Sequence, residues 1–253
     1  MSAGYDDWNS HWQSFGNSSE VNPAVLYRQN FLIRLIFKHN TKSGNLLLDI
    51  GCGTGSFLRK VEDLNSGLIL VGIEPSVSGC ERSTAQSSAR IVQGDVLTLD
   101  PASLDLAQIA DFAICSEVIE HLDNPSQFLQ QCKKFIKPSG KIFLTVPGGW
   151  RSEYDKHIGH RQHFSKRLLT ETLTCAGYKN IKIFRAGFPV FNIYKLMTIL
   201  AGKKLIQTAS VTEDHRDSKM IGFLSKVFNP LFKCSLPNFP FGWQLVAIAE
   251  IRE

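Results

Sequence analysis

Short apolar runs alternate with amphipathic segments along the middle of the chain, and turn residues separate them. Apolar runs of this length, bounded by glycine, proline or aspartate, predict buried strands at Leu46–Ile50, Leu68–Glu74, Arg90–Gly94, Phe112–Cys115 and Lys141–Val146. Helices are predicted between and after them, at Ser56–Leu64, Val77–Ser87, Ser126–Ile136 and Lys166–Ala176. The alternation predicts an α/β fold in which β-α units stack into a parallel sheet.

The end of the chain departs from this repeat. Ser165 is a suitable N-cap for the last of these helices, and Gly177 closes it. A sixth strand is predicted at Ile181–Arg185 and a long apolar seventh strand at Trp243–Ile251, with no helix after it. Because no crossover helix follows, we expect the last strand to be antiparallel.

Two segments lie outside the repeat and divide the chain into four parts. Residues 1–45 carry several aromatic side chains and a predicted helix over Ala24–His39, and they form an N-terminal helical cap. Residues 46–186 form the core, residues 187–242 an inserted lid, and residues 243–253 the final core strand. The insertion combines apolar residues at helical spacing with seven lysines and arginines against three acidic residues. It can serve as a packed lid, a dimer face or a membrane surface.

Composition narrows the class of protein. The 253 residues are 43% apolar and 20% charged, which predicts a soluble globular chain. The net charge of +5 is too mild and dispersed for a dedicated nucleic-acid binder. Lysines interrupt the most apolar region, so no transmembrane segment is expected, and the acidic start argues against a secretory signal. Six dispersed cysteines suit reduced thiols and a cytoplasmic location.

The strongest local signal is the loop Asp49-Ile-Gly-Cys-Gly-Thr-Gly-Ser56, which joins the first strand to a helix. Glycines there permit positive φ angles and let a ligand approach the backbone at the carboxyl end of a parallel strand. Glu74 ends the next strand, where a carboxylate can bind both hydroxyls of a ribose. An ordinary tight turn would not need three alternate glycines. The pattern therefore predicts a nucleoside site.

The spacing of the glycines decides which nucleoside the pattern favours. A dinucleotide fingerprint has the form G-x-G-x-x-G, and Ser56 stands where its third glycine would be. The spacing here is G-x-G-x-G, accompanied by Asp49 before the loop, Glu74-Pro75 after the second strand and Gly94-Asp95-Val96 after the third. Over about residues 46–147 this set resembles the class I S-adenosylmethionine-dependent methyltransferases. Lys137-Pro-Ser-Gly140 resembles the turn that usually precedes their fifth strand.

The resemblance implies a Rossmann-like, mostly parallel seven-stranded sheet of order 3-2-1-4-5-7-6, with S-adenosylmethionine as cofactor. In that family Asp49 and the loop glycines Gly51 and Gly53 would face the methionine part, Glu74 with Pro75 the ribose, and Asp95 with Val96 the adenine. Ser116, in the loop after the fourth strand, would lie beside the sulfonium. Arg28 resembles an arginine that binds the cofactor carboxylate in related enzymes, and a solvated helix face is the equal alternative.

The segment after the fourth strand holds the first candidates for acceptor chemistry. Glu117, Glu120 and His121 resemble an E-x-x-E-H element of ubiquinone-biosynthesis O-methyltransferases, where it has been associated with a divalent metal. The same string is widespread in metal-independent methyltransferases, and we predict no metal. His121 can instead accept the proton that an acceptor hydroxyl loses. The alternative role is a histidine that hydrogen-bonds the backbone at a helix start.

A second group of proton-exchanging side chains follows the fifth strand. It comprises Tyr154, His157, His160, Arg161 and His163. The histidine spacing could bind zinc, yet no cysteine or carboxylate at ligand spacing accompanies it. We predict His160 as the other acid–base residue and His163 as a structural brace for the next helix.

Together these features predict methyl transfer from S-adenosylmethionine to oxygen on a small molecule or lipid-linked metabolite. If the lid contacts the acceptor, the acceptor has an apolar portion, and a homodimer remains open. One alternative is a quinone-precursor O-methyltransferase with a divalent metal. Another is a nicotinamide-dependent oxidoreductase, whose fingerprint requires glycine at the position of Ser56. A third is a non-catalytic cofactor-binding protein, which would have no need of the histidine loop.

Overall fold

A single mixed sheet forms the centre of the computed structural model, which describes residues 7–39, 42–209 and 226–252, with backbone only over 201–209. Its seven strands lie in the order β3-β2-β1-β4-β5-β7-β6, as predicted. Only β7 runs antiparallel, pairing with β5 and β6. The strands are β1 (Leu46–Ile50), β2 (Ile69–Glu74), β3 (Arg90–Gln93), β4 (Ala110–Ser116), β5 (Ile136–Pro147), β6 (Tyr178–Ala186) and β7 (Gln244–Ile251).

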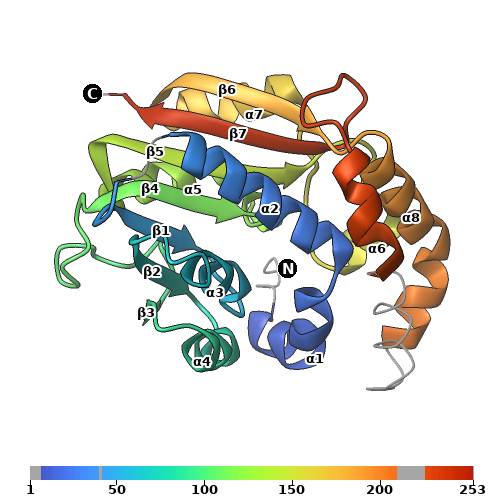
Figure 1. Ribbon diagram of the computed structural model, residues 1–253, viewed down its shortest axis with the longest axis horizontal. Coiled ribbons are helices and arrows are strands. Elements are labelled where there is room, and N and C mark those ends of the chain that lie inside the picture. Colours follow the sequence, from blue (N-terminus) through green and yellow to red (C-terminus); the bar gives the residue numbers. More distant parts are fainter. Residues whose placement is uncertain (1–6, 40–41, 210–225, 253) are drawn as a thin grey trace.

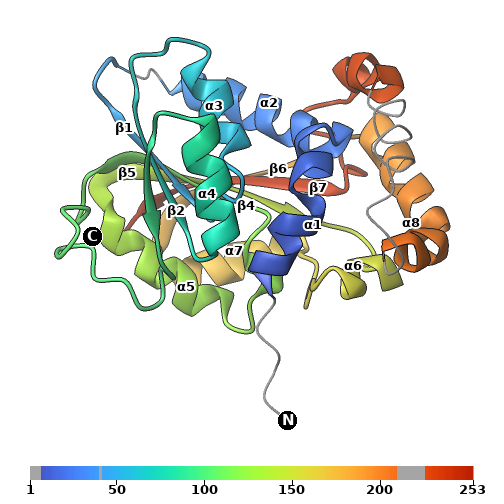
Figure 2. The ribbon, with the colours of Figure 1, turned by 90° about the horizontal axis from the view of Figure 1, so that it is seen from below.

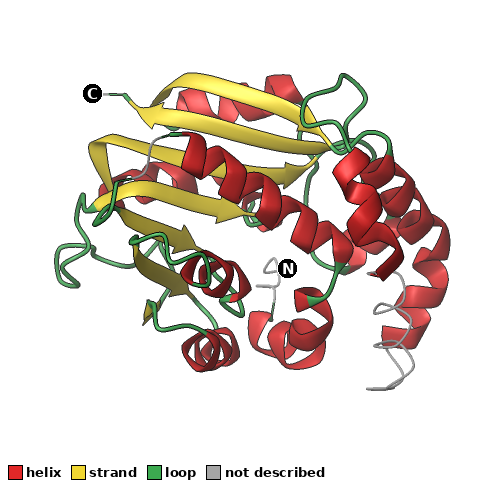
Figure 3. Ribbon diagram, viewed as in Figure 1, coloured by secondary structure: helices red, strands yellow, loops and turns green. Residues whose placement is uncertain are grey.

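Helices cover both faces of this sheet, α2 and α3 on one face and α5 and α7 on the other (Figure 2). Short polar side chains begin most of them: Ser165 accepts a hydrogen bond from the Leu168 N–H, as predicted, and Asn22 caps α2. The helices are α1 (Trp8–Glu20), α2 (Pro23–Lys38), α3 (Ser56–Glu62), α4 (Val77–Gln86), α5 (Pro125–Cys132), α6 (Glu153–His157), α7 (Lys166–Cys175) and α8 (Val190–Ala209). Figure 3 shows the resulting layers.

Alternation along the strands produces two separate cores. Leu47 packs with α2 and α3, whereas its neighbour Leu48 packs with the residues of α5 and α7 on the opposite face. Both leucines are fully buried, which is why the first strand begins with consecutive apolar residues and is interrupted only at Asp49. The carboxyl ends of the parallel strands all point toward the side on which α1, α6 and α8 lie (Figure 1).

Several predicted boundaries are wrong. The helix predicted over Ser126–Ile136 ends at Cys132 and continues only as a 3-10 turn, because the chain joins β5 at Ile136. The segment Lys137–Gly140 is therefore part of β5 rather than a turn before it, and the β4–β5 register shifts there. A Cβ on Gly140 would lie 2.8 Å from the carbonyl oxygen of Ala110, so this irregular pairing needs a glycine. The helices α1 and α6 were not predicted.

The insertion between β6 and β7 packs on the same core as α2. Phe191 of α8 is 4% exposed and contacts the ring of Tyr27, and Phe228 and Phe232 complete this aromatic cluster. Residues 210–225, which carry all three acidic residues of the expected lid, lie outside the described part of the chain. Within the described part, none of the helices has the length and apolarity that crossing a bilayer requires.

Candidate active site

The glycine loop turns back over the end of β2. The N–H groups of Gly51 and Cys52 both donate to the carbonyl oxygen of Ile73, at 2.8 and 3.1 Å. Gly51 has a φ of +76°, and a Cβ there would lie 2.7 Å from the Val118 side chain. Gly53 also has a positive φ, and its missing Cβ would meet the ring of Trp12 at 2.6 Å. The glycines therefore let the side chains of Val118 and Trp12 approach the loop backbone closely, at the sheet edge where a ligand is predicted.

Glu74 is placed at the carboxyl end of β2, directly against this loop. Its carboxylate accepts from the Gly53 N–H at 2.9 Å and from the N–H and hydroxyl of Ser76 at 3.1 and 2.5 Å. A carboxylate offers about four lone-pair positions, so these donors leave little free capacity. Glu74 thus holds the glycine loop as well as facing the predicted ribose site, and the adjacent Pro75 is exposed.

Asp49 is a second buried acidic residue of the predicted cofactor site. It lies in β1 between Gly72 of β2 and Ile114 of β4, with 4% of its surface exposed. Burial, and then repulsion from Glu74, raise the pKa of its carboxyl to about 7. A buried carboxylate with a second one nearby is most stable when a cation lies beside it. The sulfonium and ammonium groups of S-adenosylmethionine fit this demand.

The loop after β3 supplies the predicted adenine end of the site. Asp95 forms a turn in which its carboxylate accepts from the Leu97 N–H at 2.9 Å, and Val96 is buried in the core. The Gly94 N–H donates to the Glu74 carbonyl at 2.9 Å. This bond fixes the two loops relative to each other, so the candidate ribose and adenine residues lie at one edge of the sheet.

A polar network lies at the carboxyl end of β4. Glu117 has a φ of +56°, which is unusual for a residue other than glycine, and its Oε1 accepts from Thr145 at 3.0 Å and Gln244 at 2.9 Å. Ser116 shares a hydrogen bond of 2.8 Å with Thr145. Arg28 of α2 points its guanidinium at Glu117, 3.7 Å from Oε2. The structure therefore brings Arg28 and Ser116 together at the place predicted for the cofactor's methionine end.

Two imidazoles meet just beyond this network. His121 is the last residue of the 3-10 turn Ile119–His121, and its ring centroid lies 4.8 Å from that of His160, with the ring planes nearly perpendicular. The two residues are brought together because the Arg161 N–H donates to the Glu120 carbonyl at 2.8 Å. Burial, followed by the neighbouring His121, lowers the pKa of His160, which keeps this imidazole neutral near pH 7.

Glu120 lies beside this imidazole pair and is fully buried. Neither of its carboxylate oxygens has a hydrogen-bond partner within the described residues. Burial, and then the charge of Glu117, raise the pKa of this carboxyl well above its usual range. A buried polar group of this kind marks a place where a bound molecule can supply the missing hydrogen bonds.

Ligand-type side chains gather here in two overlapping sets. Glu120, His121 and His160 have atoms within 4.8 Å of one another, and so do Asp155, His160 and His163. Glu117 belongs to neither set, so the three side chains of the E-x-x-E-H element do not converge on one point among the described residues. Asp155 is a carboxylate that the sequence analysis did not find beside the histidines. The absence of a metal stays a prediction.

The N-terminal helix contributes residues that the sequence analysis placed only in a cap. The Trp8 ring stands edge-on to His121 with centroids 4.8 Å apart, and Trp12 covers Gly53. Asn9 fixes the helix to α4 by accepting from the Ser78 N–H at 3.2 Å. The repeat of aromatic rings at positions 8, 11, 12 and 15 was a usable signal for a helix face directed at the site.

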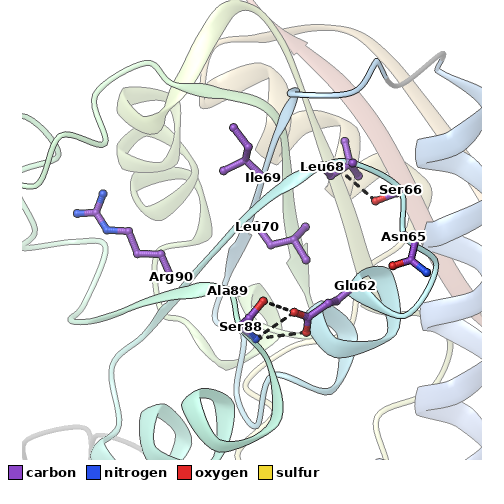
Figure 4. A pocket seen from close by; sticks show the side chains of 10 residues that line it. Glu62, Asn65, Ser66, Leu68, Ile69, Leu70, Ser88, Ala89 and Arg90 are labelled. Atoms are coloured by element: carbon purple, nitrogen blue, oxygen red, sulfur yellow. Dashed lines mark hydrogen bonds between the residues drawn. The ribbon is translucent and has the colours of Figure 1, made fainter.

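A separate hollow of about 460 Å³ lies at the other end of the strands. It is lined by Glu62 and by residues at the amino ends of β2 and β3, including Leu70 and Arg90 (Figure 4). Glu62 accepts there from the Ser88 N–H. The hollow carries none of the predicted site residues, because the ligand edge of a parallel sheet is the opposite one.

Comparison with known proteins identifies the fold that carries this site. A family model described as "Methyltransferase domain" matches residues 26–183. The chain belongs to this methyltransferase family. The match confirms the prediction of an S-adenosylmethionine-dependent methyltransferase and of its cofactor. The residues assigned to the cofactor and to catalysis stay predictions.

The relatives of this methyltransferase are distant. It is 31% identical over 147 residues to the mitochondrial ubiquinone biosynthesis O-methyltransferase of Mus musculus, a match that covers 53% of the chain and 39% of that protein. It is 28% identical over 148 residues to the ubiquinone biosynthesis O-methyltransferase of Rickettsia canadensis, covering 58% of the chain and 60% of that protein. The chain therefore spans well under two thirds of these relatives.

Solved structures share the fold at lower identity. A SAM-dependent methyltransferase from Thermotoga maritima superimposes with a TM-score of 0.59 at 15% identity, covering 96% of each chain. The phosphoethanolamine N-methyltransferase 2 of Haemonchus contortus, solved with S-adenosyl-L-methionine, superimposes with a TM-score of 0.58 at 16% identity. That match covers 88% of this methyltransferase and 52% of the other chain.

Proposed function

We propose that this methyltransferase transfers the methyl group of S-adenosylmethionine to an oxygen atom of a small molecule. The observation that carries the proposal is the imidazole pair His121 and His160, which lies at the same sheet edge as the glycine loop and Glu74. A hydroxyl must lose its proton as its oxygen is methylated, and a neutral imidazole can accept that proton. The names of the relatives, which are O-methyltransferases, agree with this choice.

The remaining residues would act by placing the reactants. A sulfonium is already an excellent leaving group, so holding oxygen, methyl carbon and sulfur in line supplies most of the rate enhancement. Asp49 would face the positively charged methionine part of the cofactor, and Arg28 would bind the carboxylate of that part. Trp8 contacts His121, so its ring would border the acceptor whose hydroxyl is deprotonated by the imidazole pair.

Whether the acceptor has an apolar portion is inferred from the lid insertion. One side of α8 leaves Ile193, Leu196, Met197 and Leu200 exposed, and Leu200 is 78% exposed. An acceptor with an apolar portion or a second copy of the chain could cover this surface. We keep both as parts of the proposal, together with a cytoplasmic location, which the six unpaired cysteines favour.

A transfer assay tests the proposed reaction. The full chain is incubated with S-adenosylmethionine labelled in the methyl group and with matched hydroxyl, amine and thiol compounds, and the labelled atom is identified by NMR. We expect label on oxygen, and label found only on nitrogen or sulfur would overturn the proposal. We also expect activity to survive a chelator. Activity that is lost with the chelator and restored by magnesium would favour the alternative with a divalent metal.

Variants test the role of the imidazoles in the same assay. His121→Ala and His160→Ala should each lower the turnover number by ~100-fold, the usual contribution of a general base. Affinity for S-adenosylhomocysteine, measured by calorimetry, should stay unchanged. His157→Ala is the matched control because His157 is exposed and lies on the same segment. Full turnover in both test variants would show that positioning alone suffices.

A further inference from the structure

Asp155 is a buried carboxylate that the proposed reaction does not yet use. It lies in the first turn of α6 and is fully buried. Its Oδ2 accepts from the Ser152 N–H at 2.8 Å and the Ser152 hydroxyl at 2.6 Å, and Ser152 in turn accepts from the Asp155 N–H. This reciprocal capping box fixes the direction of the carboxylate.

The carboxylate faces the second pair of histidines. Its Oδ1 lies 3.9 Å from Nδ1 of His160, and its Oδ2 lies 3.8 Å from Nε2 of His163. These two ring nitrogens also share a hydrogen bond of 3.1 Å, in which one imidazole donates and the other accepts. A single fixed anion therefore lies at nearly equal distances from both ends of one imidazole–imidazole hydrogen bond, and its negative charge favours a proton between the two rings.

The lid insertion supplies the counter-charge. Lys195 of α8 donates to Oδ1 of Asp155, and α8 packs against α6. The Lys195 side chain is 19% exposed, so this ion pair is screened less than a surface pair. The net charge next to His160 and His163 thus depends on a residue from the inserted helix.

We propose that Asp155 is a positioning residue that orients His160 and His163, and that Lys195 links this unit to the lid helix α8. The inference rests on the proposed function in one respect, because it assigns the oriented His160 to proton transfer. Asp155 would stabilise the imidazolium that forms when a proton is accepted, in the manner of a buried aspartate behind a catalytic histidine. Lys195 would limit this effect, since its charge opposes a second positive charge nearby.

The surrounding charges predict that Asp155 and Lys195 have opposite effects on the pKa values of His160 and His163. Five titratable groups face His160, namely His121, Asp155, His163, Lys195 and Glu120. Burial opposes ionisation of Asp155, but the charge and hydrogen bond of Lys195 and the bonds from Ser152 lower the pKa of its carboxyl, so it is anionic. Burial lowers the pKa of His160 and of His163, while the charge of Asp155 raises both.

NMR titration of labelled histidines tests this inference without an acceptor. The full chain, saturated with S-adenosylhomocysteine, is compared as wild type, Asp155→Asn and Lys195→Met. Ser152 remains the N-cap of α6, and the amide oxygen of Asn can still accept from the Ser152 N–H, so the first variant removes the charge and leaves the helix. We expect the pKa values of His160 and His163 to rise by about one unit in Lys195→Met and to fall in Asp155→Asn. The imidazole ¹⁵N shifts report which ring nitrogens carry protons, and we expect the tautomer populations of His160 and His163 to differ between the wild type and Asp155→Asn.

Lys156→Met is the matched control, because Lys156 lies on the same helix and pairs with the exposed Glu153. Equal histidine titration in Lys195→Met and Lys156→Met would overturn the inference, and so would an unchanged tautomer in Asp155→Asn. If the NMR changes occur as expected but the transfer assay detects no methyl transfer to oxygen, the inference about Asp155 stands and only the proposed function is contradicted. Where an acceptor is found, Asp155→Asn should lower the turnover number and leave the KM for S-adenosylmethionine unchanged.

Discussion

At the scale of single residues, the candidate site holds two carboxylates whose surroundings differ sharply. Glu74 receives hydrogen bonds from Gly53 and Ser76, so its charge is satisfied by the protein. Asp49 lies in the interior of the sheet, and burial and Glu74 raise the pKa of its carboxyl to about 7. The ionised carboxylate of Asp49 therefore destabilises the fold without a ligand, which is the pattern expected where a ligand rather than the protein supplies the compensating positive charge.

This cost predicts a pH-dependent gain in stability for Asp49→Asn. The unfolded chain binds the Asp49 proton with a pKa near 3.9, below that of the folded chain, so folding loses stability as the pH rises from about 4 to about 7. Removing the carboxylate should therefore stabilise the cofactor-free protein, and by roughly 2 kcal/mol more at pH 8 than at pH 5. Urea unfolding at the two pH values measures the difference.

Binding measurements provide the check on this interpretation of Asp49. The same variant should bind S-adenosylmethionine more weakly at pH 8, because the counter-charge for the cofactor's positive end is lost. Thr172→Ala is a suitable control, since Thr172 is a buried polar residue of α7 whose hydroxyl donates to the Leu168 carbonyl of its own helix. If Asp49→Asn is less stable than the wild type at pH 8, Asp49 has a structural role that its burial does not reveal.

At the scale of elements, α1 is the part of the site that the sequence analysis did not find. Its aromatic residues were recognised, but α1 has no apolar core of its own, and only Gly16 among its residues is buried. Its position depends on polar contacts to α4, such as the bond from Arg82 to Asn17 at 2.7 Å, which join residues 65 positions apart. The repeat of aromatic rings marks one face of α1, but Trp8, His11 and Trp12 are only half-buried, so this repeat was not recognised as a helix that packs on the site.

The contact of α1 with the glycine loop predicts that Trp12 contributes to cofactor affinity. Its ring covers Gly53, so a molecule bound against the loop would be partly enclosed by the indole. Trp12→Ala should weaken the binding of S-adenosylhomocysteine by about tenfold, near the lower end of the value for burying a large apolar side chain. Phe15→Ala is the control on the same helix, because Phe15 is 38% exposed. Equal affinities in titration calorimetry for Trp12→Ala and Phe15→Ala would contradict the prediction.

At the scale of the whole molecule, the architecture was more accessible to sequence reasoning than the site. The β1 bounds, the Ser165 cap and the antiparallel β7 follow from local pattern and are confirmed. The order of strands followed only from the family resemblance, because pairing over long range leaves no local mark. Asp155 lies only eight residues before His163, so its place beside the histidines had a local signal that was missed, whereas its contact with Lys195 depends on how α6 and α8 fold together.

The aromatic start of the lid insertion predicts how this part of the molecule behaves without ligand. Phe188 stacks on Phe239 with ring centroids 4.7 Å apart, Phe191 is buried against Tyr27, and Tyr194 stands edge-on to Phe228 at 5.2 Å. Tyr27, Phe191 and Phe228 belong to the core that also holds α2, and Tyr194 packs against it. The start of α8 is thus part of the folded core, and closing over an acceptor would not be needed to bury it.

Amide hydrogen exchange measures this directly. Residues 190–194 should exchange slowly in the free chain, with protection comparable to that of β4, because opening them requires separating the aromatic core around Phe191. Adding S-adenosylhomocysteine should change their exchange little, whereas the loop over Gly51–Gly55 should slow. Fast exchange of 190–194 in the free chain, with slowing only when an acceptor is also bound, would show instead a lid that orders on the substrate. In that case the aromatic rings at the start of α8 would become the strongest argument for an acceptor with an apolar portion.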